Sequence, residues 1–222
     1  MTSAAPVRYN CGMSDQDPAA SDAAPSNPGL LVIISGPSGV GKSTITNAIL
    51  DRLNAKLSIS MTTRPRAATD VDGEHYHFVD VPSFREAIDG DALLEWAEVY
   101  GNYYGTPRRF VEDQLAAGEV VVLEIDIEGA IQVQRNLPGT YAVFILAPDE
   151  EALLDRLRSR KRDDEATIQR RFSRAKAEIA RAKESNVYQA YVVNDDFDRA
   201  VDEVAGLIAA ERQSRAQAQP AG

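Results

Sequence analysis

The sequence predicts an α/β fold in which a parallel sheet is covered by helices on both faces, giving a three-layer core. Short continuous apolar runs, rich in β-branched residues, alternate with segments of helical pattern, and this is typical of buried parallel strands. A glycine-rich turn joins the first apolar run to the first helical segment. Between residues 57 and 106 the alternation breaks into short strand-like pieces with many aromatic residues, which indicates an inserted subdomain.

The elements of the core follow one another along the chain. Strands are predicted over residues 30–34, 120–125, 141–146 and 191–193, and helices over residues 42–53, 108–117, 127–135, 149–160, 165–184 and 197–212. The core is therefore expected at 30–58, 107–158 and 172–212, with an insertion at 59–106 that carries a small mixed sheet and a short helical lid at 159–171. Residues 1–29 are predicted to be a disordered tail and residues 213–222 a flexible C-terminus.

Composition limits the possible functions. The chain has 222 residues, 44% of them hydrophobic, which is enough for one domain between residues 30 and 212. The formal net charge of −10 argues against a general binder of nucleic acid or of anionic membrane. Cys11 is the only cysteine, which fits a reducing compartment. No apolar run approaches the roughly 18–20 residues that span a bilayer, and the N-terminus does not read as a signal peptide, so we expect a cytoplasmic protein. The oligomeric state is left open.

Residues 36–43 read GPSGVGKS and match the phosphate-binding pattern G-x-x-x-x-G-K-[ST] between a strand and a helix. Such a loop turns backbone N–H groups towards phosphate oxygens at a helix N-terminus. Lys42 is expected to reach the β- and γ-phosphates of ATP, and the Ser43 hydroxyl to bind Mg²⁺. The predicted ATP-binding residues here are Gly36, Pro37, Ser38, Gly39, Val40, Gly41, Lys42, Ser43 and Thr44.

Further motifs follow in the insertion and after it: SMTTRPR at 60–66, GEHYHF at 73–78, LEWAE at 94–98, GNYYGT at 101–106, DIEG at 126–129 and VNDD at 193–196. Together with the P-loop and an arginine-rich segment, they resemble guanylate kinase from about residue 30 to residue 207. The resemblance implies a P-loop NTPase core, a GMP-binding insertion, and transfer of the γ-phosphate of ATP to GMP with Mg²⁺.

The chemistry of guanine agrees with this resemblance. Guanine presents a ring N–H and an amine side by side, next to a carbonyl oxygen. The Glu95 carboxylate could accept from both donors, and the Ser60 and Thr106 hydroxyls could donate to the carbonyl, as the matching positions do in guanylate kinases. Adenine lacks the donor pair, so a buried carboxylate discriminates against it.

The acceptor phosphate requires cations and donors. By resemblance, Arg64, Tyr76 and Tyr104 contact the phosphate of GMP, and Asp126 lies at the acceptor site. The loop departs from the family pattern R-x-P-R-x-G-E, since it reads RPRAATD from residue 64 and places Ala67 where the second arginine belongs. We infer that the loop shifts by one residue and that Arg66 reaches the GMP phosphate instead.

The arginine-rich segment supplies local positive charge in an acidic chain. By motif matching, Arg156, Arg160 and Arg171 clamp ATP and the transferring group, and Asn194 lies near adenine. The catalytic residues are then Lys42, Arg64, Arg160 and Arg171, which neutralise charge during transfer. Solvated surface is favoured for Arg158, Arg162, Arg170 and Arg174, a core position for Trp96, and either a structural or a ligand-side role for Glu124.

Two other functions are compatible with parts of the pattern. One is a kinase of the same fold for another acceptor, such as a ribosyl bisphosphate; the Glu95 and Thr106 pair argues against it, and the altered loop around Arg66 keeps it open. The other is a non-catalytic guanylate-kinase-like binding module. The intact P-loop and the lid arginines argue against a module.

Overall fold

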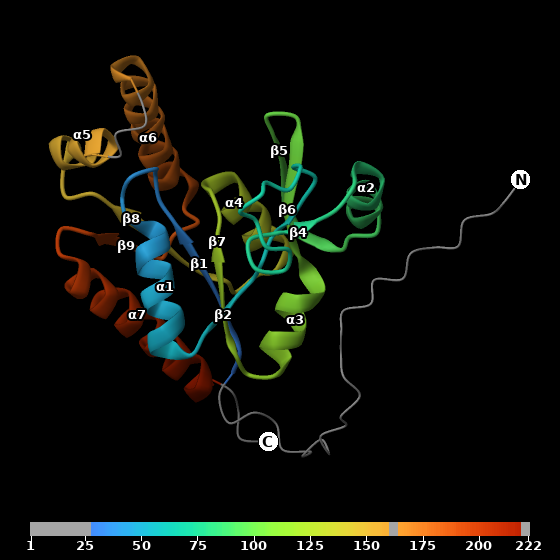
Figure 1. The fold of residues 1–222 in the computed structure, drawn as a ribbon. Helices are drawn as coiled ribbons and strands as arrows, with labels where there is room; N and C mark the ends of the chain where they lie inside the picture. Colours follow the sequence, from blue (N-terminus) through green and yellow to red (C-terminus); the bar gives the residue numbers. More distant parts are fainter. Residues whose placement is uncertain (1–27, 160–163, 219–222) are drawn as a thin grey trace, which may run out of the picture.

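The computed structural model describes residues 28–159 and 164–218 (Figure 1). Most of the predicted N-terminal tail, the first part of the predicted lid with Arg160, and the last residues of the chain lie outside this part. Within the described part, no helix combines the length and the apolar character that a membrane span requires.

The predicted parallel sheet is confirmed. Five strands run in the order β2-β7-β1-β8-β9, and every pairing between neighbours is parallel. Their bounds are Leu30–Ser35 (β1), Lys56–Leu57 (β2), Val120–Glu124 (β7), Tyr141–Leu146 (β8) and Ala190–Val193 (β9). Because the strands are parallel, their carboxyl ends meet at one edge of the sheet, where ligands of open α/β sheets bind.

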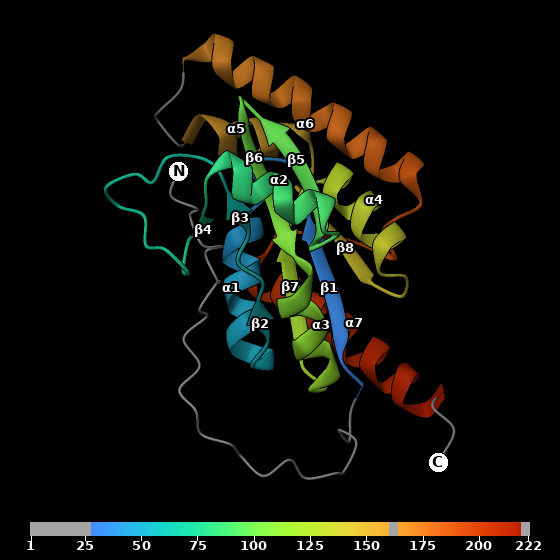
Figure 2. The same ribbon diagram turned by 90° about the vertical axis from the view of Figure 1, so that its right-hand side faces the viewer.

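Helices cover both faces of the sheet, as the sequence predicted (Figures 1 and 2). Successive residues of β1 point to opposite faces, and both sets are buried, which explains why the strand is apolar throughout. One face packs against α1 (Lys42–Leu53), α5 (Glu150–Ser159) and α7 (Phe197–Ala218), and the other against α3 (Arg108–Ala116) and α4 (Ile127–Asn136). The long helix α6 (Glu165–Ser185) contributes residues to both apolar clusters. Helix α7 continues past the predicted end at residue 212 because its last turns consist of good helix formers.

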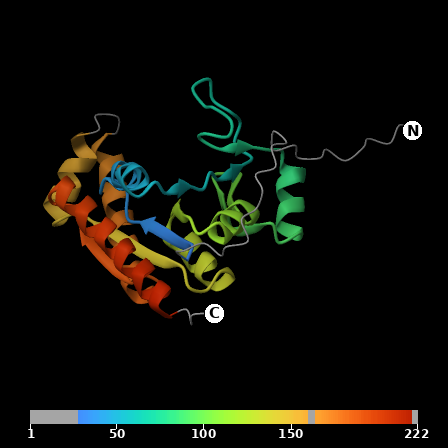
Figure 3. The same cartoon turned by 90° about the horizontal axis from the view of Figure 1, so that it is seen from below.

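The region at 57–106 forms a second, mixed sheet with the strand order β4-β3-β6-β5. Its strands are Met61–Thr62 (β3), His77–Phe78 (β4), Leu93–Val99 (β5) and Asn102–Pro107 (β6). Helix α2 (Val81–Asp89), which the sequence reading did not predict, begins where the Asp80 carboxylate accepts the Ser83 N–H at 2.8 Å. Seen from below, α2 lies on the opposite side of the molecule from α5 and α7 (Figure 3).

Helix α4 holds the second sheet against the core. Strand β5 is an edge strand of that sheet, so part of its backbone has no strand partner. The Gln132 side chain exchanges two hydrogen bonds with the backbone of Trp96 (3.2 and 3.1 Å), and Asn136 Nδ2 donates to Leu94 O at 2.8 Å. Strand β5 is therefore fixed on α4 at two consecutive turns of the helix.

The predicted core position of Trp96 is wrong, since this side chain is 39% exposed. Strand β5 leaves the core after Leu94 and continues into a projecting hairpin, whose tip residue Tyr100 is 92% exposed. Trp96 packs edge-on against Tyr103 of the neighbouring strand, with ring centroids 6.1 Å apart. An apolar side chain on this hairpin is covered by its cross-strand neighbour rather than by the core.

Candidate active site

The P-loop connects the end of β1 to the start of α1, at the edge where the carboxyl ends of the strands meet (Figure 1). Gly41 has φ 91°, and a Cβ on it would lie 2.7 Å from Asn194 Nδ2, so both the backbone and the space require glycine. Lys42 Nζ donates to the carbonyls of Gly36 at 2.5 Å and Pro37 at 3.0 Å. The ammonium group therefore lies over the loop, where it can meet phosphate oxygens.

Two further predicted ATP residues brace this loop. Asn194 follows β9 and is buried, and its Nδ2 donates to Val40 O at 2.7 Å. One Arg156 NH2 group donates to Asn194 O at 2.7 Å. In the described structure Arg156 thus holds Asn194, and Asn194 holds the P-loop at Val40.

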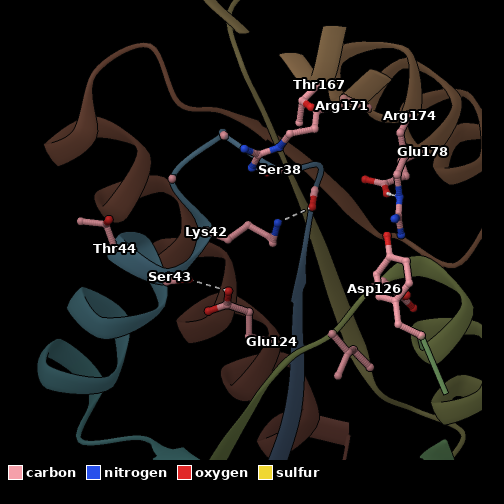
Figure 4. A pocket seen from close by; sticks show the side chains of 16 residues that line it. Ser38, Lys42, Ser43, Thr44, Glu124, Asp126, Thr167, Arg171, Arg174 and Glu178 are labelled. Atoms are coloured by element: carbon pink, nitrogen blue, oxygen red, sulfur yellow. Dashed lines mark hydrogen bonds and ion pairs between the residues drawn. The ribbon is translucent and has the colours of Figure 1, made fainter. Parts of the chain in front are cut away.

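Ser43 meets the carboxyl end of β7. Its hydroxyl donates to Glu124 Oε1 at 2.7 Å (Figure 4). The sequence left open a structural role and a ligand-side role for Glu124, and the structure shows the hydrogen bond that the structural role requires. A hydroxyl and a carboxylate side by side provide the oxygen ligands that Mg²⁺ prefers, so the residues present fit this ion.

The long helix α6 faces the P-loop across the cleft. Arg171 donates to Ser38 Oγ at 2.5 Å, so this predicted lid arginine reaches the loop directly (Figure 4). Arg174 and Glu178 form an ion pair of 2.9 Å on the same side of α6. Arg160, the remaining predicted lid arginine, lies outside the described residues.

The site is a cleft with two chambers. The larger has a volume of about 760 Å³ and lies between the P-loop, the end of β7 and α6. The smaller, about 180 Å³, is lined by Ser60, Tyr76, Glu95 and Tyr104 among others. Residues Glu124, Ile125 and Asp126 line both chambers. A donor bound in one chamber and an acceptor bound in the other would therefore meet beside the end of β7.

The smaller chamber contains a buried carboxyl group. Glu95 is 8% exposed, and Thr106 Oγ1, directly across from it on β6, donates to Glu95 Oε1 at 2.6 Å. Burial, with a smaller contribution from the nearby Asp126 charge, raises the pKa of Glu95 to about 7. Because the one hydroxyl proton of Thr106 is directed at Glu95, Ser60 remains the hydroxyl available to a ligand carbonyl.

Arg64 lies beside the aromatic wall of the smaller chamber. Its guanidinium carbon is 5.3 Å from the centre of the Tyr76 ring, and the Tyr76 and Tyr104 centroids are 5.8 Å apart. Asp70 forms an ion pair of 2.9 Å with Arg64. The backbone N–H of Ala67, together with Arg64, lowers the pKa of Asp70. The structure therefore brings together Arg64, Tyr76 and Tyr104, the three residues expected at the GMP phosphate.

Arg66 occupies a different environment. Its side chain is exposed, and Nε donates to the backbone carbonyl of Asp70 at 2.9 Å, within its own loop. Arg66 does not line either of the two chambers. Its predicted contact with a phosphate would require the loop to move.

Sequence reasoning missed part of the larger chamber. Arg174, assigned to solvated surface, lines it together with Thr167, Glu178 and the hairpin residue Tyr100. The Arg174 side chain is also 67% exposed, so it is both solvated and on the cleft. The sequence did indicate a place on the cleft for Arg174, because it follows the predicted lid arginine Arg171 by three positions and residues three or four apart share one helix face.

Comparison with known proteins gives one consistent result. The family model described as guanylate kinase matches residues 29–211. The chain is 48% identical over 185 residues to the guanylate kinase of Syntrophomonas wolfei, covering 83% of this chain and 93% of that protein. It is 45% identical over 189 residues to that of Rhizobium etli, covering 84% of each.

The crystal structure of guanylate kinase from Anaplasma phagocytophilum superposes with a TM-score of 0.66 at 29% identity, covering 84% of this chain and 87% of that one. The residues that the family model matches include the P-loop, the second sheet and α6. The chain therefore belongs to the guanylate kinase family.

Proposed function

We propose that this protein transfers the γ-phosphate of ATP to GMP, giving ADP and GDP, and so recycles GMP in purine nucleotide metabolism. The observation that carries the proposal is the two-chamber cleft, with a P-loop in one chamber and the buried Glu95 carboxyl in the other. The names of its relatives point to the same reaction.

ATP would bind in the larger chamber. The backbone of the P-loop, the N-terminus of α1 and the Lys42 ammonium would hold the phosphates. Asn194 contacts the P-loop and Arg156 contacts Asn194, so these two residues would hold the loop in its conformation. Ser43 and Glu124 would hold Mg²⁺, which neutralises phosphate charge when it is bound.

GMP would bind in the smaller chamber, within the insertion at 59–106. An ionised Glu95 would accept both guanine donors, Thr106 would fix that carboxylate, and Ser60 would donate to the guanine carbonyl. Arg64, Tyr76 and Tyr104 would receive the phosphate, with Asp126 at the nucleoside and Arg66 arriving after a loop movement.

Transfer would be in line, from the γ-phosphorus to an oxygen of the GMP phosphate. That oxygen is already anionic near neutral pH, so no general base is required. Lys42, Arg64, Arg171 and Arg160 would stabilise charge on the transferring group. The segment 159–171 would act as the lid that excludes water. A cytoplasmic location would supply both nucleotides.

The test is an ADP-release assay with MgATP that compares GMP with AMP, UMP and CMP at equal concentration. Turnover with GMP far above the other acceptors is expected. A folded protein that binds ATP but turns over none of the four would contradict the proposal.

A further inference from the structure

We propose that Gly129 is a specificity-determining residue, because it provides the space in which the Glu95 carboxylate can face guanine. The inference rests on the proposed function and adds to it a residue that would touch neither substrate. It starts from the packing between α4 and β5, where the smaller chamber meets the core.

Gly129 lies in the first turn of α4, and its N–H donates to Asp126 Oδ1 at 2.9 Å. Its φ is outside the left-handed region, so the backbone conformation does not require glycine. Glycine is also a poor helix former. Another requirement must therefore account for glycine at this position.

That requirement is space. A Cβ on Gly129 would lie 3.2 Å from Glu95 Oε2 and 3.5 Å from Glu95 Cδ, closer than ordinary van der Waals contact for the nearer atom. The carboxylate would have to move by a few tenths of an ångström. Gly129 is therefore the wall against which the recognition carboxylate rests.

The surroundings leave Glu95 little room to yield. Thr106 Oγ1 holds Oε1 at 2.6 Å from one side. Strand β5 cannot easily back away, because Gln132 and Asn136 tie its backbone to the same helix. Residues 129, 132 and 136 share one face of α4, so the helix that fixes the strand also fixes the distance between Gly129 and Glu95.

The consequence concerns recognition more than stability. A side chain at position 129 would turn Oε2 away from the position that faces the two guanine donors, and misplacement of a positioned group is costly in affinity. The three atoms nearest to an added Cβ belong to Glu95 and Ile125 and none to the P-loop, so ATP binding is expected not to change.

The experiment compares Gly129→Ala with Gly206→Ala. Gly206 lies in α7, where an added Cβ would meet nothing within 4 Å, and serves as a matched helix-glycine control. Gly129→Ala is expected to raise KM and calorimetric Kd for GMP by about tenfold and to leave KM for ATP within about twofold. The melting temperature should not fall, since alanine is the better helix former. Gly206→Ala should change none of these constants.

A second variant separates a steric role from general damage. Glu95→Asp withdraws the carboxylate by one methylene, so Gly129→Ala made in that background should cost less than about twofold in Kd for GMP. Equal GMP constants for Gly129→Ala and Gly206→Ala would overturn the inference. So would equal losses with and without Glu95→Asp, or a parallel loss of ATP affinity. Wild-type protein without GMP turnover or binding would instead overturn the proposed function, and this inference with it.

Discussion

Replacement of Glu95 by glutamine is expected to stabilise the nucleotide-free protein while removing its recognition of GMP. Burial raises the pKa of Glu95 to about 7, so above neutral pH the folded protein carries a costly charge in the smaller chamber. Glutamine has nearly the same shape and can still accept the Thr106 hydrogen bond, but it carries no charge.

The size of the effect follows from the two pKa values. The folded pKa of about 7 lies above the ordinary value of 4.5, so the folded state binds more protons than the unfolded state between them. The free energy of unfolding of the wild type therefore falls as pH rises through this window and levels off above it. At 1.36 kcal/mol per pKa unit the total is about 3 kcal/mol. Glu95→Gln should gain about 1 kcal/mol at pH 5 and about 3 kcal/mol at pH 8.

Urea unfolding followed by circular dichroism at pH 5, 6, 7 and 8 measures this difference. Glu98→Gln, at an exposed carboxylate on the same strand, is the control and should change the free energy of unfolding by less than about 0.5 kcal/mol. Calorimetry at pH 8 should show GMP binding weakened by more than about 100-fold in Glu95→Gln, because the amide presents donors where guanine also presents them. A stability gain that is the same at pH 5 and pH 8, or a loss at pH 8, would refute the reasoning.

Other predictions concern the two chambers separately. Because guanine requires the ionised form of Glu95, KM for GMP should rise as pH falls from 8 to 6 while KM for ATP stays constant; initial rates check this, and a parallel rise in both constants would contradict it. Arg66→Ala should raise KM for GMP by more than about tenfold if the loop brings Arg66 to the phosphate, whereas the exposed Arg109→Ala should have no effect. If Arg66→Ala also left KM for GMP unchanged, Arg66 would be an ordinary surface residue. Gly41→Ala should weaken ATP binding by more than about tenfold in calorimetry with GMP binding retained, since its Cβ would meet Asn194.

The core of the fold was predictable because its signals are local. Strand β1 is buried on both faces and therefore apolar at every position, and the P-loop glycines follow it directly. Helix α2 was missed although Asp80 and Pro82 mark its start, because the aromatic residues around it suggested strands. The exposure of Trp96 depends on how far the hairpin projects from the core, which composition does not indicate.

The candidate site was predictable in its residue types but less so in its contacts. The pairing of Thr106 with Glu95 depends on the register between β5 and β6, which a sequence does not state. The contact of Arg171 with Ser38 joins segments distant in sequence, and the contact of Arg64 with Tyr76 depends on the path of the loop between them. Arg66 was expected to face a phosphate, and the hydrogen bond to its own loop became visible only in three dimensions.

The short segment from Glu124 to Asp126 lines both chambers, and this limits how the protein can change over evolutionary time. A substitution there alters the surroundings of donor and acceptor together, so a change that favours the binding of one substrate also affects the binding of the other. No single residue of the second sheet or its hairpin is among those that line both chambers. A lineage that drifts towards a new acceptor should therefore accumulate its changes in the insertion, while this junction stays nearly fixed.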